Sequence, residues 1–227
     1  VILILILTTV VCMAVHAWRS LSAAASSNSE LAKRLAMEAS HDALTGLPNR
    51  RFFDKWARRL VAKSQRSGKP FTLLAVDLDS FKEVNDSHGH GVGDEVLKAV
   101  AVRFQELLRG GEFLARLGGD EFTILMEGEF SRHEVARIGQ RLIESVAPSL
   151  HPLLADGAVG ASIGAASFPL NGVDLDGLMQ SADDALYASK HGGRGILSFA
   201  RPGVGAAHQS YAAPTAGAVG EDAGALQ

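Results

Sequence analysis

The chain has 227 residues and 47% of them are hydrophobic, which is enough for one domain with a real core plus short extensions. Its formal net charge of −3 gives no electrostatic argument for binding to nucleic acid. The single cysteine, Cys12, excludes an intrachain disulfide and a zinc site built from cysteine and histidine. His88 and His90 flank one glycine, and we interpret them as hydrogen-bonding loop residues because no further spacing typical of metal ligands accompanies them.

An apolar segment begins the chain. Residues 1–18 carry no charged side chain and are rich in Val, Ile and Leu, and Arg19 ends the run. A transmembrane helix needs about 20 such residues, so the run predicts the C-terminal part of a membrane span. Since the chain starts at Val, we expect the rest of this helix and a sensor domain upstream. Arg19, Lys33 and Arg34 follow closely and predict that the downstream part lies in the cytoplasm. A secretory signal peptide is the alternative, but its basic leading segment is missing.

Residues 19–40 are predicted to link this span to a domain. Small or polar side chains dominate up to Ser29, and then Leu31 and Leu35 have helical spacing behind a capping residue, Asn28 or Ser29. The segment is too short to predict a coiled coil.

The first part of the domain reads as helix, strand, helix. Asn49 can cap a helix with an apolar stripe, and residues 67–70 (Ser-Gly-Lys-Pro) end it. Residues 71–79 form a nearly continuous apolar run that ends in carboxylates, as a buried strand does when it delivers acids to the edge of a sheet. Residues 80–84 predict a helical turn whose free N–H groups form a phosphate site. Gly89, Gly91 and Gly93 predict an open loop before a helix over 94–108.

Residues 116–122, Arg-Leu-Gly-Gly-Asp-Glu-Phe, predict a hairpin turn between strands at 113–115 and 122–126. Two glycines supply the backbone freedom, and Asp120 and Glu121 place adjacent carboxylates on the lip of the turn. Adjacent like charges are costly to desolvate, so the pair indicates a bound cation such as Mg²⁺, which prefers oxygen ligands. An exposed acidic turn is the alternative. If the 71–79 strand lies beside the hairpin, Asp77 and Asp120 can share a metal.

The remaining patterns complete one domain. They predict a helix capped by Ser131 and ending at Val146, a strand over 161–166, a helix over 175–190 and a closing strand over 196–199. The order predicts an α+β fold over residues 41–200, with a mainly antiparallel sheet flanked by helices. Residues 201–227 are rich in Gly, Ala and Pro, which predicts a disordered tail.

Five ordered blocks of this domain resemble one known family. The blocks are Asp42–Arg50 (DALTGLPNR), Asp77–Lys82 (DLDSFK), Asn85–Asp94 (ND, GH and GD), Gly118–Phe122 (GGDEF) and Ala185–Arg194 (ALYASK and GR). They resemble the GGDEF domains of diguanylate cyclases. The resemblance implies a palm-like core shared with nucleotidyl cyclases, and the condensation of two GTP molecules into cyclic di-GMP with release of two pyrophosphates.

The resemblance also implies a metal site. Mg²⁺ or Mn²⁺ is expected at Asp77, at the backbone carbonyl of Leu78 and at Asp120. Glu121 is expected as a further ligand or as an aid in deprotonating the attacking 3′-hydroxyl. Gly118 and Gly119 are expected to let the substrate approach the turn, since no Cβ stands in the way.

Substrate contacts follow from the same resemblance. Asn85 and Asp94 are implied to bind guanine, and Ser80, Phe81 and Lys82 are implied to bind the terminal phosphates together with Lys190 and Arg194. Each assignment has a plainer alternative. Asp94 could be a helix N-cap, Asn85 a turn residue, and the last two cations a complement to the negative end of a helix.

The chain departs from the family pattern at two places. An inhibitory product site in relatives begins with Arg-x-x-Asp, whereas Arg109 is followed by Glu112 here, so product inhibition is an open expectation. Arg116 aligns with a basic position of the same site. Gly195 stands where Asn commonly follows the Gly-Arg pair, which affects only the local geometry expected of the phosphate clamp.

The expected partners are GTP, a second copy of the chain and a membrane, without nucleic acid. One copy is expected to hold half a site, so two domains must face each other, and residues 19–40 either form an ordinary linker or resemble the helix that pairs such domains. The expected location is the inner membrane, with the domain in the cytoplasm. Two other functions stay open: a GGDEF module that only senses GTP or cyclic di-GMP, and a structural oligomerisation domain at the membrane.

Overall fold

The computed structural model describes Met13, His16, Trp18, Arg19, Met37 and residues 39–108 and 111–202. Most of the predicted membrane span (1–18) and of the linker (19–40), and nearly all of the predicted tail (201–227), lie outside the described residues. In the part of the chain that the structure describes, no helix combines the length and the hydropathy that a membrane span requires.

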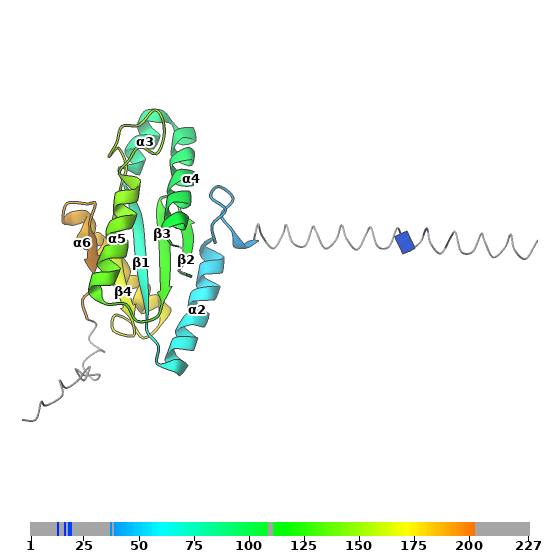
Figure 1. Ribbon diagram of the computed structural model, residues 1–227, viewed down its shortest axis with the longest axis vertical. Helices are drawn as coiled ribbons and strands as arrows, with labels where there is room; N and C mark the ends of the chain where they lie inside the picture. Colours follow the sequence, from blue (N-terminus) through cyan, green and yellow to red (C-terminus); the bar gives the residue numbers. More distant parts are fainter. Residues whose placement is uncertain are drawn as a thin grey trace, which may run out of the picture.

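The described elements follow the predicted order. The strands are β1 (Phe71–Asp79), β2 (Phe113–Gly118), β3 (Glu121–Glu127), β4 (Gly160–Phe168) and β5 (Leu197–Phe199). The helices are α2 (Arg50–Ser67), α3 (Phe81–His88), α4 (His90–Leu107), α5 (Arg132–Val146) and α6 (Leu175–His191) (Figure 1). The two predicted caps are confirmed: Asn49 accepts a hydrogen bond from the backbone of Phe52, and Ser131 forms a capping box with Glu134.

One five-stranded sheet has the order β2-β3-β1-β4-β5, so β1 is central. The pairs β2–β3, β3–β1 and β1–β4 are antiparallel, while β4 and β5 are parallel. The sheet is therefore mixed, which corrects the expectation of a mainly antiparallel sheet. The physical reason is the crossover through α6, because a helical connection between neighbouring strands returns the chain in the same direction.

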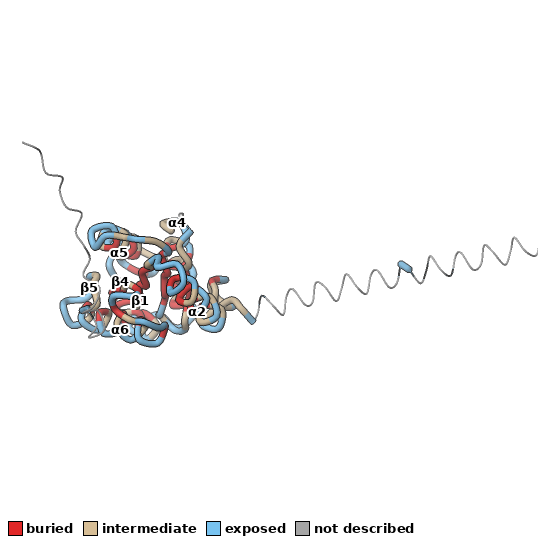
Figure 2. Tube along the Cα trace, turned by 90° about the horizontal axis from the view of Figure 1, so that it is seen from below, coloured by how far each residue is buried: buried red, intermediate tan, exposed pale blue. Residues whose placement is uncertain are grey.

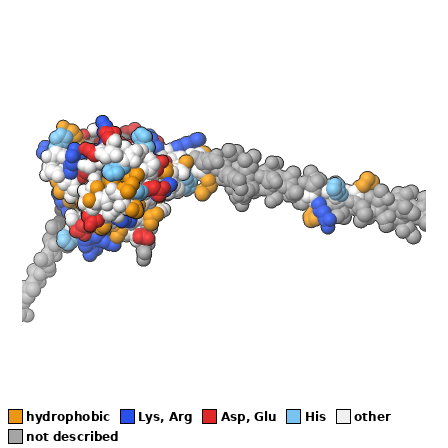
Figure 3. All heavy atoms as spheres, turned by 90° about the horizontal axis from the view of Figure 1, so that it is seen from above, with side chains coloured by type: hydrophobic (Ala, Val, Ile, Leu, Met, Phe, Trp, Pro, Cys, Tyr) orange, Lys and Arg blue, Asp and Glu red, His pale blue; other side chains and the backbone are white. Residues whose placement is uncertain are grey.

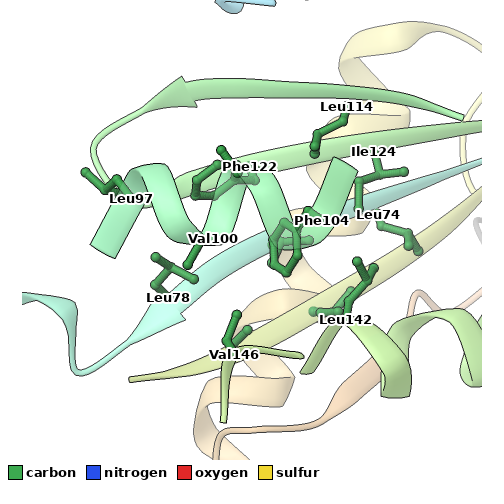
Figure 4. Packing of buried hydrophobic residues seen from close by; sticks show 14 of the residues in the cluster. Leu74, Leu78, Leu97, Val100, Phe104, Leu114, Phe122, Ile124, Leu142 and Val146 are labelled. Carbon is green, nitrogen blue, oxygen red and sulfur yellow. The ribbon is translucent and has the colours of Figure 1, made fainter. Parts of the chain in front are cut away.

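Helices cover both faces of the sheet. Alternate residues of β1 point to opposite faces, so Leu74, Val76 and Leu78 pack with α4 and α5, whereas Leu73 and Ala75 pack with α2 and α6. Figure 4 shows the first of these two cores. Figure 2 shows the buried residues along the middle of the domain between exposed outer turns. On the face seen in Figure 3, acidic and basic side chains are interspersed.

The connection between α3 and α4 differs from the prediction. Gly89 alone separates the two helices, and Gly91 and Gly93 lie inside α4 rather than in an open loop. The alternative in which Asp94 is a helix N-cap therefore does not hold, and the helix predicted over 94–108 begins earlier, since Asp94 is the fifth residue of α4. Likewise His88 ends α3 and His90 begins α4. The φ of Gly89 is 81°, so one glycine in the left-handed region makes the turn by itself.

The segment that enters the domain is bonded to the β2–β3 turn. Arg116 is only 9% exposed, and its guanidinium donates to the Asp42 carboxylate at 2.7 Å and to the Gly119 carbonyl at 2.8 and 3.0 Å. Asp42 also accepts from the backbone and hydroxyl of Thr45. Burial alone would raise the pKa of Asp42, but the hydrogen bonds from Thr45 and Arg116 outweigh it and hold the pKa below its ordinary value.

We expect Asp42→Ala to lower the free energy of unfolding by about 2–4 kcal/mol, because it leaves the buried Arg116 without its carboxylate. A lowered pKa stabilises the fold above the pKa of the unfolded chain. The stability difference between parent and variant should therefore hold at neutral pH and shrink as the pH falls below about 4. Denaturant unfolding across this pH range measures it. Asp176→Asn, at an exposed ion pair with Arg58, is the control and should change little. A difference that does not depend on pH would contradict the role of the Asp42 charge.

Candidate active site

The end of β1 places carboxylates on the face of the sheet covered by α6. Asp77 pairs in register with Glu121 of β3 and with Ser162 of β4. Its side chain is 13% exposed, and its Oδ2 forms an ion pair with Nζ of Lys190 at 2.8 Å. Lys190 therefore does more than complement the end of α6, because it forms an ion pair with the expected metal ligand.

The β2–β3 turn is held against this strand end. Gly118 has a φ of 148° and Gly119 a φ of 52°, which side chains rarely allow, and the ladder shifts register at this point. A Cβ on either glycine would meet nothing within 4 Å, so the turn is open to an approaching molecule. The backbone N–H of Leu78 donates to the carbonyl of Asp120 at 3.3 Å. This bond keeps Asp120 beside Asp77.

A cavity of about 190 Å³ lies between these segments. It is lined by Asp77, Leu78, Asp79, Ser80, Phe81, Lys82, Glu83, Asp120, Lys190 and Arg194. The structure thus brings together the predicted metal residues of β1 and the turn with all five predicted phosphate residues. Glu121, Asn85 and Asp94 are not among its lining residues.

Backbone strain is concentrated at the same cavity. Among the described residues, two that are not glycine have a positive φ, Ser80 at 60° and Arg194 at 61°, and both line the cavity. The left-handed conformation costs such residues roughly 1–2 kcal/mol each, so the surrounding contacts must hold them there. The φ of Gly195 is 60°. Gly adopts this conformation without strain and Asn tolerates it best after Gly, so either residue suits this position.

The electrostatics of the cavity favour a cation. Burial raises the pKa of Asp77, and the charges of Asp120 and Asp79 raise it further, while Lys190 lowers it only in part. A positive ion next to Asp77 would relieve both the burial cost and the repulsion. In the described part of the chain, no three acidic, histidine or cysteine side chains form a ready-made metal cluster. The donors that are present still fit Mg²⁺, which takes one or two carboxylates and completes its shell with carbonyl, water and phosphate oxygens.

A second cavity of about 320 Å³ lies on the other side of the Asp77–Lys190 ion pair, between α2 and α6. Glu121 lines this cavity, and its carboxylate is paired with Arg50 at 3.3 Å. Asp183 of α6 lines it as well, and burial together with the charge of Glu121 raises the pKa of Asp183. The adjacent carboxylates Asp120 and Glu121 therefore face different cavities. The sequence predicted no role for Arg50 or Asp183. Arg50 ends the first family block, whereas Asp183 lies outside all five blocks, so no sequence signal pointed to it.

The two residues predicted to bind guanine lie at the corner between α3 and α4. Gly93 packs so closely on α3 that a Cβ there would lie 2.0 Å from Oδ1 of Asn85. Asp94 is the next residue of α4 and is exposed. The missing side chain at Gly93 thus allows the amide of Asn85 to lie beside the helix that carries Asp94.

The predicted product site is described only in part. Arg109 lies outside the described residues, and Glu112 is half-buried. The guanidinium of Arg116 donates hydrogen bonds to Asp42 and to the Gly119 carbonyl, so it supports the turn. Inhibition at this site stays a prediction.

Comparisons with known proteins agree with this geometry. The model of the family described as diguanylate cyclase, GGDEF domain, matches residues 39–195. The chain is 40% identical over 188 residues to the probable diguanylate cyclase DgcE of Escherichia coli K12 and 42% identical over 161 residues to the diguanylate cyclase DosC of the same strain. These matches cover 81% and 69% of this chain, but the chain spans only 17% and 34% of the length of these relatives.

A solved structure shows the same fold. The coiled coil and GGDEF domain of DgcB from Caulobacter crescentus, in complex with c-di-GMP, is 31% identical and superposes with a TM-score of 0.72. The superposition covers 79% of this chain and 95% of that one. Since the family model spans more than half of the residues, the chain belongs to the GGDEF domain family.

Proposed function

We propose that this domain is a diguanylate cyclase, which condenses two GTP molecules into cyclic di-GMP and releases two pyrophosphates. One observation carries the proposal: a single strained cavity joins the carboxylates of Asp77 and Asp120 with the cations Lys190 and Arg194. Oxygen ligands for a divalent metal beside cations for phosphate are what nucleotidyl transfer requires. The curated relatives named as diguanylate cyclases support the same reaction.

The terminal phosphates of GTP would lie at the start of α3. The first N–H groups of this helix, at Phe81 and Lys82, have no partner within the helix and suit a phosphate group. Lys190 and Arg194 approach the same cavity from the end of α6 and the loop after it. They hold the pyrophosphate as negative charge develops on it.

Asp77, Asp120 and the carbonyl of Leu78 would hold Mg²⁺ or Mn²⁺. The metal, when bound, supplies charge neutralisation at the reacting phosphate and at the leaving oxygen. Lys190 forms an ion pair with the Asp77 carboxylate, so we expect its ammonium group to shift to the phosphates when substrate binds. Asn85 and Asp94 would read the guanine, since an amide accepts and donates and a carboxylate accepts from N–H groups.

The reaction needs a second copy of the chain. The 3′-oxygen of one GTP attacks the α-phosphorus of the other, a new P–O bond forms, and the bond to the bridging oxygen breaks as pyrophosphate leaves. We propose that Glu121 accepts the proton of the 3′-hydroxyl, because its carboxylate lies at the exposed rim and its residue pairs in register with Asp77. A two-fold pair of facing domains lets each nucleotide act once as nucleophile, so the second attack closes the ring.

We also propose that residues 1–18 anchor the chain in the inner membrane with the domain in the cytoplasm. The support is the apolar run and the cations that follow it. Residues 19–40 would then connect the anchor to the domain and set how two domains meet.

We expect Asp120→Asn to lower cyclic di-GMP formation by roughly a hundredfold or more, because the amide gives up the charge that holds the metal. The measurement is incubation with GTP and Mg²⁺, followed by chromatography and mass detection of the product. Asp176→Asn, far from the cavity on the first turn of α6, serves as the matched control and should keep the parent rate.

The outcome that would overturn the cyclase proposal is equally direct. If the parent binds GTP but forms no cyclic di-GMP, even when two copies are joined by a fused dimerisation domain, the domain is a binding module.

A second prediction concerns guanine recognition. Gly93→Ala should raise the KM for GTP by about tenfold, because its Cβ would push the amide of Asn85 away. Gly91→Ala is the matched control, since it lies in the same helix and a Cβ there meets nothing within 4 Å. Ala favours a helix over Gly, so both variants should fold, and the control should be slightly more stable. Equal KM values for the two variants would contradict the placement of the base at Asn85.

A further inference from the structure

A buried carboxylate in the wall of the phosphate cavity takes no part in the proposed chemistry. Asp79 is the last residue of β1 and is 7% exposed. Both of its oxygens lie 2.9 Å from the hydroxyl of Ser162, and Oδ2 accepts a hydrogen bond from the backbone N–H of Gly195 at 3.1 Å. A charged group that is buried this deeply has to be compensated by such donors.

These bonds connect the two strained walls of the cavity. Ser80 directly follows Asp79 in the chain, and Arg194 directly precedes Gly195. Ser80 and Arg194 are the two residues that hold a left-handed conformation without being glycine in the described ranges. The hydrogen bond from Gly195 to Asp79 therefore joins both of them across 116 residues of sequence.

The other side of Arg194 is fixed to α6. Its backbone N–H donates to the carbonyl of Ser189 at 3.1 Å, and the N–H of Gly192 donates to the carbonyl of Ala188. Ser189 is fully buried and its hydroxyl donates to the carbonyl of Ile163 in β4. Arg194 is thus held between a bond to the helix before it and a bond to Asp79 after it.

We propose that Asp79 is a positioning residue for phosphate binding. Its carboxylate holds Gly195 and Ser162, and so keeps the backbone of Arg194 in the strained conformation from which the guanidinium reaches the cavity. Asp79 lines the cavity, but Ser162 and Gly195 engage its oxygens, so we assign it the positioning of Arg194 rather than a contact with substrate. The inference rests on the proposed function, because it assigns the terminal phosphates of GTP to Arg194.

The test measures binding rather than turnover. Affinities of the whole chain for GTP and for GMP are compared by calorimetry in the presence of Mg²⁺, for the parent, Asp79→Asn, Arg194→Ala and the double variant. Asp79→Asn keeps the size of the side chain and removes the charge that strengthens its hydrogen bonds. We expect this variant to lower the affinity for GTP about tenfold and to change the affinity for GMP by no more than about twofold, because GMP lacks the terminal phosphates.

The double variant separates positioning from mere support of the fold. If Asp79 acts through Arg194, the double variant should bind GTP less than about twofold more weakly than Arg194→Ala alone. Equal losses for GTP and GMP, or effects that multiply in the double variant, would show a structural role and overturn the proposal. A parent chain that does not bind GTP would instead refute the proposed function.

Ser162→Ala covers the case in which Asp79→Asn fails to fold. This variant leaves the carboxylate and its bond to Gly195 but removes the hydroxyl donor. The ratio of GTP to GMP affinity should fall in the same direction by a smaller factor, about threefold. An unchanged ratio would refute the role of Asp79.

Discussion

Asp77 and Glu121 lie directly opposite each other on neighbouring antiparallel strands, and like charges in that position repel. The fold compensates each acid separately. Arg50 at the start of α2 pairs with Glu121, and Lys190 near the end of α6 pairs with Asp77. The two helices that cover this face therefore each contribute a cation to the same sheet edge. Burial still leaves the pKa of Asp77 raised, so a cation beside Asp77 would stabilise its charged form.

The segments around these acids are held by hydrogen bonds of their own. The turn with Asp120 is held by Arg116, which is in turn held by Asp42 in the segment that enters the domain. The loop with Arg194 is held by Asp79 at the end of β1. One contact uses the half-buried carboxylate of Asp42 and the other the buried carboxylate of Asp79 to keep a charged or strained segment in place. The stability of the domain and the geometry of its cavity thus depend on the same few bonds.

Local signals were enough to predict much of the fold. Short stretches of sequence predict the acidic end of β1, the glycine turn and the caps at Asn49 and Ser131. The structure has all of these features. The α3–α4 connection was missed because three glycines at alternate positions look like a loop, whereas only Gly89 turns the chain. The parallel pairing of β5 was also missed. The helix between the last two strands was predicted, but no local pattern records that these two strands lie next to each other in the sheet.

Part of the candidate site could also be located from the sequence. Residues that match the family blocks were identified by type and spacing. The structure gathers Asp77, Leu78 and Asp120 with the five residues predicted to bind phosphate in one cavity, while Glu121 lines another. Contacts between distant segments were not predictable, because a sequence without aligned relatives shows no pairing. The bond from Gly195 to Asp79 and the ion pair between Arg50 and Glu121 are of this kind.

The separation of Asp120 from Glu121 has a consequence for the signature turn itself. A strand directs successive side chains to opposite faces, and here the bulge before Gly118 and the turn aim two adjacent acids into two cavities that share Asp77 and Lys190. One acid can then serve the metal beside the phosphates while the other stays at the exposed rim, where a hydroxyl from a second copy can arrive. Two carboxylates that pointed into one cavity would share one cation and leave the incoming nucleophile without a base. In the proposed reaction the adjacent pair would thus supply two different roles from consecutive residues, and the ion pair of Asp77 with Lys190 lies between the two cavities.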